Sequence, residues 1–262
     1  MKKSNLLNSL ILTALAVPGV AMAADAPEHA FTSNIGLVSN YLYRGLSQTG
    51  GKPALQGGFD YAHASGVYAG VWGSNVSWVV ASSASLELDT YAGYKGGFAG
   101  DFSYDVGYLR YNYTGVYAEP LAAGTAKADT DEIYGALGWK FLTLKYSHSL
   151  GDTFGVDEAS GTSYVELNAS YAMADSGVTL GAHYGKQTYK GTAADALDAA
   201  GTPATYSDYK LSASKDFSGY VVGLAYSKTN AKSGGFWTAT QADGSKTDLG
   251  KGTAVLSVSH AM

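Results

Sequence analysis

The sequence contains no cysteine among its 262 residues, which excludes a disulfide framework and a thiolate metal site. It has only 5 prolines, and only 15% of its residues are charged. Basic residues are in the minority, since 17 Lys and Arg stand against 22 Asp and Glu, and no basic tract occurs. A chain of this kind lacks the electrostatic footprint of a nucleic-acid-binding protein, so we expect no nucleic acid partner.

A second absence concerns long apolar runs, of which there is one, at the N-terminus. Two lysines precede the apolar residues 6–20, and residues 21–23 (Ala-Met-Ala) supply small side chains at positions −3 and −1. The run is shorter than the ~20 residues that span a bilayer as a helix. We therefore predict a cleaved signal peptide over residues 1–23 and a mature domain over residues 24–262. If the mature chain lies in a membrane, it spans as strands.

Glycine and tyrosine are abundant, with 34 Gly and 21 Tyr. Glycine is about 7% of an average protein, and this chain holds roughly twice that share. Tyrosine is amphipathic and collects at membrane interfaces, and glycine lets strands bend and pack closely in a curved sheet. The composition is that of a bacterial β-barrel more than of a globular enzyme.

Alternation of apolar and polar residues predicts the strands. Residues 102–108 (FSYDVGY) are the clearest case, because every second residue is apolar and the others are small or polar. An alternating strand has two faces in opposite solvents. We predict about twelve strands, an even number as bacterial single-chain barrels require, at residues 31–43, 55–62, 67–74, 86–89, 102–108, 133–141, 142–150, 165–171, 178–184, 206–215, 220–228 and 253–262.

The connections between these strands are long and short in turn. The long ones, rich in Gly, Ala, Thr, Ser and Asp, are residues 45–53, 75–85, 114–130, 151–161, 190–203 and 231–250. The others are turn-sized. This rhythm predicts an all-β fold: a closed antiparallel transmembrane β-barrel with short periplasmic turns, longer extracellular loops and both termini on the turn side. A soluble β-sandwich or repeat protein is the alternative.

Because alternate residues of a strand point to opposite faces, the position of a residue along its strand predicts whether its side chain faces the lumen; we call this its parity. If the apolar positions face lipid, the charged positions face inward and avoid the several kcal/mol that a charge costs at the lipid midplane. Acids outnumber bases in this set, which is consistent with a mild cation preference or with charges that pair across the lumen. The predicted pore-lining residues are Arg44, Asp60, Glu87, Asp89, Asp105, Glu132, Lys140, Lys145, Glu166, Asp208 and Lys210.

Two further groups bear on the lumen. Small inward residues such as Gly93 and Gly107 favour open volume, and so favour a channel. Aromatic residues near strand ends fit the interfacial girdles of a barrel, although ordinary sheet packing would also explain them; they are Trp72, Trp139, Tyr94, Tyr108, Tyr171, Tyr184, Tyr220 and Tyr226. The sequence leaves open whether the loop at 114–130 or 231–250 folds inward and constricts the lumen.

The N-terminal third carries the motif Y-R-G-L-S-Q at residues 43–48, followed by G-G-F-D-Y-A at 57–62 and G-V-Y-A-G-V-W-G-S-N at 66–75. This stretch resembles the TorF-like porins of bacteria. The resemblance implies an outer-membrane barrel of about this size that acts as a porin. It implies no catalytic residues.

Arg44 is the most conspicuous residue of that motif. Parity places it on the polar face near the outer mouth, where its guanidinium fork could bind a carboxylate or phosphate of a solute. The alternative is a structural one, in which Arg44 pairs with a lumen acid and fixes the first loop.

The sequence does not support an enzyme. There is no G-x-S-x-G motif, and adjacent strand residues such as His148 and Ser149 point to opposite faces, so they cannot form a catalytic pair. The 5 His show no H-x-x-x-H spacing, and no glycine-rich segment ends in the Lys-Ser/Thr of a phosphate loop. We expect no cofactor, no metal and no catalytic residue.

The function that these observations favour is a channel for passive diffusion of small hydrophilic solutes in the outer membrane of a Gram-negative bacterium. A closed structural or adhesive barrel without transport is the alternative. The expected partners are outer-membrane lipid, the solutes, and, during biogenesis, periplasmic chaperones and the barrel-assembly machinery. Barrels of this kind commonly end in an aromatic residue, whereas this chain ends in Met262.

Overall fold

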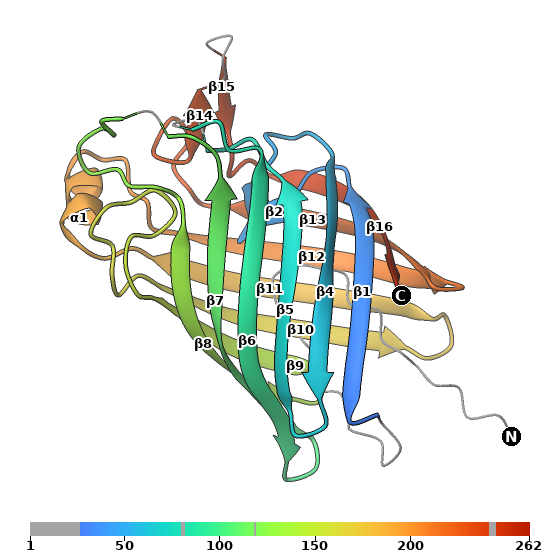
Figure 1. The fold of residues 1–262 in the computed structure, drawn as a ribbon. Coiled ribbons are helices and arrows are strands. Elements are labelled where there is room, and N and C mark those ends of the chain that lie inside the picture. The colour runs from blue at the N-terminus through green and yellow to red at the C-terminus, as the bar shows by residue number, and fades with distance from the viewer. Residues whose placement is uncertain (1–26, 80–81, 118, 241–244) are drawn as a thin grey trace, which may run out of the picture.

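Twelve antiparallel strands close into a barrel in the computed structural model, which describes residues 27–79, 82–117, 119–240 and 245–262 (Figure 1). The predicted signal peptide lies outside the described residues. The fold predicted from the sequence is confirmed, and each predicted strand has its counterpart. In chain order the wall strands are β1 (His29–Val38), β4 (Ala54–His63), β5 (Val67–Asn75), β6 (Leu86–Phe98), β7 (Phe102–Thr114), β8 (Thr130–Trp139), β9 (Leu142–Ser149), β10 (Ser163–Met173), β11 (Val178–Thr188), β12 (Tyr206–Phe217), β13 (Tyr220–Thr229) and β16 (Thr253–Ala261).

The barrel closes where the first strand meets the last. β1 pairs with β4 over ten residue pairs, from His29↔His63 to Val38↔Ala54. On its other side β1 pairs with β16 over only five, from Asn34↔Ala261 to Val38↔Ser257. Because the ladder is continuous around the wall, the backbone N–H and C=O groups are satisfied by neighbouring strands, as a membrane-spanning structure requires.

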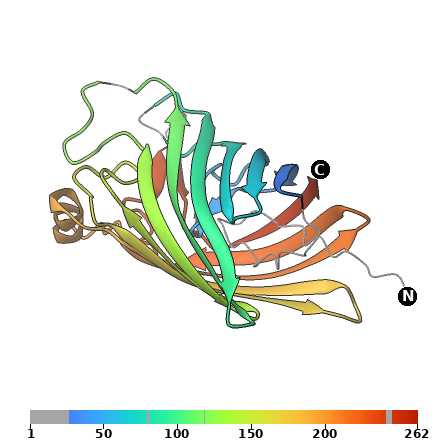
Figure 2. The same ribbon diagram turned by 60° about the horizontal axis from the view of Figure 1, so that its bottom comes forward.

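The connections gather by length at the two ends of the barrel (Figures 1 and 2). The short turns lie at one end, here called the turn end, and the long connections lie at the other, the loop end. The loop-end connections contain β2 (Leu42–Tyr43), β3 (Leu46–Ser47), the helix α1 (Thr192–Ala199), β14 (Thr238–Thr240) and β15 (Lys246–Asp248). No helix in the described part of the chain is long and apolar enough to cross a membrane.

Each wall strand has an apolar outer face and a polar inner face. On β7 the inward Asp105 is 8% exposed, whereas its outward neighbour Val106 is 50% exposed. Large exposed apolar side chains such as Phe59, Leu144 and Leu224 continue this outer face around the barrel. The period-2 alternation therefore places an apolar band outside and the charges inside.

Two expectations about the inner face are wrong. Trp72 was expected in an interfacial girdle, but it points inward from β5 and is buried against Tyr41. The inward glycines do not leave open volume where they face tyrosines. A Cβ atom on Gly107 would lie 2.5 Å from the hydroxyl of Tyr134, and one on Gly93 would overlap the Tyr68 hydroxyl. These glycines make room for aromatic rings.

Candidate functional site

The first loop folds into the barrel. Residues 39–53 connect β1 to β4, and within them β2 and β3 pair as a small hairpin through Leu42↔Ser47 and Tyr43↔Leu46. We call residues 42–47 the lumen hairpin. Its side chains are buried, with Tyr43 only 8% and Leu46 only 3% exposed. The first loop therefore enters the lumen, which the sequence did not suggest. Of the two loops that it did suggest, 231–250 packs against the hairpin, because the Ser47 N–H donates to the Leu249 carbonyl oxygen at 2.8 Å and Trp237 is 5% exposed.

The tip of the lumen hairpin requires glycine. Arg44 and Gly45 form the turn, with φ angles of 45° and 76°. A Cβ atom on Gly45 would lie 2.6 Å from Asp208 Cβ on β12 and 2.6 Å from Thr229 Cγ2 on β13. Glycine avoids both the left-handed conformational cost and the two steric contacts. The hairpin thus extends into the lumen until its backbone contacts β12 and β13, which follow β16 around the wall from β1.

Arg44 anchors the hairpin to the opposite side of the barrel. Its Nη1 donates to Glu132 Oε1 at 2.9 Å and its Nη2 donates to Glu132 Oε2 at 2.7 Å, which makes a bidentate ion pair with β8. Nη1 also donates to Gln187 Oε1 on β11 at 2.7 Å. The side chains of Arg44 and Glu132 are 5% and 2% exposed. Of the two roles considered from the sequence, the structure confirms pairing with a lumen acid.

Aromatic rings surround the guanidinium of Arg44. Its Cζ lies 4.3 Å from the ring centroid of Tyr164 and 4.9 Å from that of Tyr43. Phe154, which comes from the connection after β9, packs edge-on against Tyr43 at 5.6 Å. Cation–π contacts of this kind stabilise a cation more strongly when it is removed from water. The ion pair is therefore enclosed on several sides by apolar faces.

Two tyrosines hold the base of the first loop. The Tyr41 hydroxyl donates to Glu87 Oε1 on β6 at 3.2 Å, and the Tyr43 and Tyr111 hydroxyls are 2.5 Å apart. Burial raises the pKa of Tyr41 and Tyr43 above its ordinary value, so both side chains remain neutral hydroxyls. As neutral hydroxyls they can hydrogen-bond to the wall, Tyr41 to Glu87 on β6 and Tyr43 to Tyr111 on β7.

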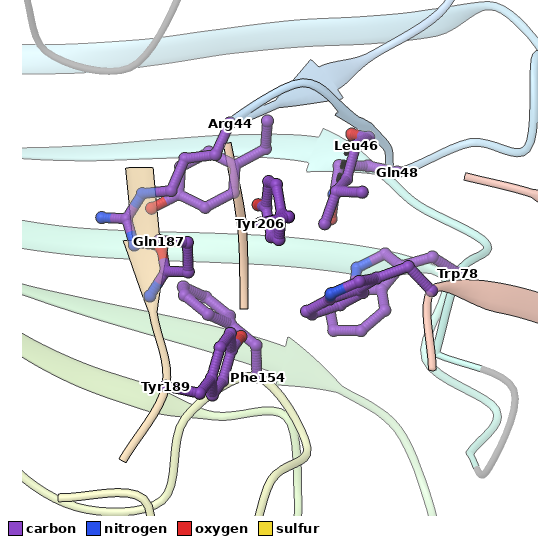
Figure 3. Close-up of a pocket in the computed structure, with 10 residues that line it drawn as sticks. Arg44, Leu46, Gln48, Trp78, Phe154, Gln187, Tyr189 and Tyr206 are labelled. Atoms are coloured by element: carbon purple, nitrogen blue, oxygen red, sulfur yellow. Dashed lines mark hydrogen bonds between the residues drawn. The ribbon is translucent and has the colours of Figure 1, made fainter. Parts of the chain in front are cut away.

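Little space remains around the hairpin at the loop end. The cavity bounded by Arg44, Gln48, Trp78, Tyr206 and their neighbours has a volume of about 10 Å³ (Figure 3). A volume of this order holds about one water molecule. In this conformation the loop-side half of the lumen is filled by side chains.

The turn-side half of the lumen is lined differently. Several of its inward positions carry small hydroxyl residues, which are partly exposed although they lie on the inner face of the wall. They include Ser103, Thr143, Thr179, Ser212, Ser214, Ser257 and Ser259. Water therefore reaches this half of the inner surface. The two halves differ in side-chain size and in exposure.

The structure places most of the predicted pore-lining residues inside the barrel, although their role in lining a pore stays a prediction. Asp60 and Lys210 are half-buried at inward positions of β4 and β12. The buried ones are Arg44, Glu87, Asp89, Asp105, Glu132, Lys145, Glu166 and Asp208.

Lys140 does not share this placement. β8 ends at Trp139, so the parity argument does not extend to Lys140, which lies in the turn before β9 with a φ angle of 53°. Its side chain is 51% exposed, and its Nζ lies 3.8 Å from Asp101 in a neighbouring turn. The expected inward position of Lys140 is wrong because a turn residue follows no strand periodicity.

Sequence reasoning missed a polar cluster on β10, β11 and β12. His183 Nε2 lies 2.9 Å from Asp208 Oδ1, and His183 Nδ1 lies 2.7 Å from Asn168 Oδ1. The Tyr164 hydroxyl donates to Asp208 Oδ2 at 2.8 Å. Inward parity alone would have included His183 and Tyr164, but only acidic and basic residues were selected as candidates. The cluster links the inner faces of β10, β11 and β12 by hydrogen bonds between side chains.

Comparisons with known proteins fit this architecture. Residues 22–262 match the Gcw_chp family, described as a bacterial protein of unknown function, and the chain belongs to this family. No curated protein matches the sequence.

Among solved structures, the chain is similar to the KdgM porin in complex with disordered oligogalacturonate, with a TM-score of 0.51 and 9% sequence identity over 88% of this chain and 98% of that one. It is also similar to the NanC porin, with a TM-score of 0.50 and 9% identity over 88% of this chain and 99% of that one. At such identities the likeness concerns the fold, which is a barrel of the kind found in outer-membrane porins. The resemblance to TorF-like porins is supported to that extent, and the TorF assignment itself stays a prediction.

Proposed function

We propose that the protein is an outer-membrane channel through which small hydrophilic solutes diffuse passively, and that the lumen hairpin closes it at the loop end. The channel interior consists of the polar inner face of the wall. The apolar outer face contacts lipid in this proposal, and an apolar band of this kind supports a location in the outer membrane. The likeness in fold to KdgM and NanC supports this proposal.

The observation that carries the proposal is the identity of the segment that fills the lumen. The wall strands at the turn end present small, partly exposed hydroxyl residues such as Ser212 and Ser214. The loop end is filled by residues of several connections between strands, among them Leu46 of residues 39–53 and Trp237 of residues 231–250, together with aromatic side chains of the wall. A loop can leave the lumen without loss of any strand pairing in the wall, whereas a wall side chain cannot.

The lining favours cations over anions. Within the described part of the chain, Glu87 and Asp89 make no ion pair, although both are buried on the inner face of β6. Arg44 is neutralised by Glu132. Once the hairpin leaves the lumen and water reaches them, carboxylates without an ion-pair partner attract cations to a pore. The proposed solutes are therefore neutral or cationic small molecules.

Single-channel recording in a planar bilayer tests the proposal. We expect wild-type protein to conduct rarely, and the double variant Arg44→Met/Glu132→Gln to give stepwise conductance far more often, because it removes the anchor without leaving a buried unpaired charge. Arg110→Ala is the matched control, since Arg110 is a half-exposed arginine that pairs with Asp131 at 2.7 Å outside the hairpin. This control is expected to conduct as the wild type does.

A closed structural barrel is the second candidate, and the cavity of only about 10 Å³ beside the hairpin favours it. The same recordings separate the two. If a variant in which residues 42–47 are replaced by a short glycine linker is folded and still conducts no ions, the channel is rejected in favour of the closed barrel.

A further inference from the structure

Three metal-ligating side chains meet at the turn end, where β1 begins and β4 ends. Glu28, His29 and His63 each offer one ligand atom, and these atoms lie within 4.8 Å of one another. Glu28 Oε1 is 3.6 Å from His63 Nε2. His29 and His63 are directly opposite in the β1–β4 ladder, and their ring centroids are 5.1 Å apart. We propose that these three residues bind one divalent transition-metal ion, with Zn²⁺ the ion that the donor set suits best.

The backbone holds the ligands in place before any ion binds. The Ala64 N–H donates to the Glu28 carbonyl oxygen at 2.9 Å, which ties the segment before β1 to the turn after β4. The two histidines are fixed by cross-strand pairing, since directly opposite residues have Cβ atoms about 4.5–5.5 Å apart. The Glu28 carboxylate is 74% exposed and free to rotate. Rotation of this side chain can bring its oxygen to the ~2.0–2.2 Å that a Zn–O bond requires.

Both imidazoles are oriented by neighbouring hydroxyl groups. His29 Nδ1 lies 3.0 Å from the Tyr61 hydroxyl, and His63 Nδ1 lies 2.8 Å from the Ser65 hydroxyl. In His29, an Nδ1 that carries its proton and donates to the hydroxyl leaves the Nε2 lone pair to a metal. The Ser65 backbone N–H donates to His63 Nδ1 at 3.1 Å, so metal binding through His63 Nε2 requires the ring proton to move to Nδ1 and this hydrogen bond to be given up. Hydrogen bonding of the non-ligating nitrogen is the usual support of a histidine ligand. Two histidines and one glutamate, with water in the fourth position, form a common zinc donor set.

The position of the site suggests what the metal does. On the β16 side the hydrogen bonds of β1 begin only at Ser33, which bonds to Met262, so the start of β1 is paired on one side, with β4 (Figure 1). An ion held by His29 and His63 joins that start to the neighbouring strand. Because the ion binds the folded barrel and not the unfolded chain, it stabilises the fold in proportion to ln(1 + [Zn²⁺]/Kd).

The spacing of residues gave no sign of this site. His29 and His63 lie far apart in the sequence and are brought together only by the register of β1 and β4. Motif rules for metal sites rely on ligands a few residues apart on one element. Rules of this kind do not detect a site whose ligands lie on different strands.

The proposal is tested by measuring zinc binding. The sample is tag-free folded protein that is purified from membranes in detergent and stripped of metal with EDTA. We expect one Zn²⁺ per chain by elemental analysis and by titration calorimetry. His63→Ala is expected to abolish stoichiometric binding, and Tyr61→Phe to weaken it by about 10–100-fold, the usual effect of losing a group that orients a ligand. The midpoint of thermal unfolding is expected to rise with Zn²⁺ in the wild type and not in His63→Ala.

His260→Ala is the matched control. His260 lies at the same end of the barrel, where it stacks on Tyr220 at 4.6 Å and has no carboxylate partner among the described residues. Folding of each variant is checked by its migration on an unheated gel. Absence of stoichiometric zinc in the folded wild type, or equal binding by the His63→Ala and His260→Ala variants, overturns the site. Neither outcome affects the conductance test.

Discussion

The two halves of the lumen are built from the same twelve strands, yet they differ in what fills them. At the loop end, inward side chains such as Ser147 and Glu132 are almost fully buried beneath the lumen hairpin and aromatic rings. At the turn end, inward serines such as Ser214 remain partly exposed. The wall alone therefore does not determine whether a barrel of this size is open. At the loop end, connections between strands fill the lumen, and the lumen hairpin is one of them.

The ion pair of Arg44 provides the most severe test of this comparison. Arg44→Ala leaves the Glu132 carboxylate, 2% exposed, without its partner. Breaking a buried pair in this way costs about 3–5 kcal/mol of unfolding free energy. The measurement is urea unfolding in micelles followed by tryptophan fluorescence.

Its control is the double variant Arg44→Met/Glu132→Gln, which is expected to recover much of that loss because no charge remains buried alone. If Arg44→Ala unfolds at the wild-type urea concentration, the hairpin is not anchored in solution and the loop-side half is not filled.

The fit of the hairpin tip against the wall is tested next, by two glycines of one loop. Gly45 and Gly51 both have positive φ angles, 76° and 85°, so alanine meets a similar backbone cost at each. Only Gly45 is crowded, since a Cβ on Gly51 would meet nothing within 4 Å. We expect Gly45→Ala to be less stable than Gly51→Ala by about 1–3 kcal/mol, the cost of overpacking. Equal unfolding midpoints would mean that the hairpin tip does not contact β12 and β13.

The smallest perturbation uses the absence of native cysteine. Ser147→Cys places a thiol in the loop-side half and Ser214→Cys places one in the turn-side half. Reactivity of a thiol depends on its exposure, so we expect Ser214→Cys to react with a charged methanethiosulfonate on the order of tenfold faster or more. Labelling rates followed by mass spectrometry give the comparison directly. Similar rates at the two positions would contradict the difference in filling.

The wall could be predicted from the sequence because lipid and water on opposite faces impose a strict alternation. Residues 102–108 show this alternation clearly, and β7 contains them. The charged residues predicted to face the lumen followed the same parity where they lie on wall strands, whereas Arg110, Asp131 and Lys186 lie on the outer face of theirs. Trp72 did not, because its neighbours in β5 include apolar or small residues on both faces, so the alternation there is too weak to assign a side.

The closure of the lumen could not be predicted in the same way. The contacts of Arg44 with β8 and β11 depend on the curvature of the whole wall, which brings those strands opposite the first loop. No local pattern encodes that distance. Composition did identify Arg44 as a residue able to pair with an acid, but it did not identify Glu132 as the partner or Gln187 as a second acceptor.

The reach of the Arg44 side chain has a consequence for how the molecule matures. Its two partners are 88 and 143 residues away along the polypeptide. Contacts between such distant segments form late, since the entropy of closing a long chain segment must be lost before they can contribute. The pairs that close the wall, such as Asn34 with Ala261, are farther apart still. By the same reasoning, we expect β1 and β16 to join last, after the partners of Arg44 have become available.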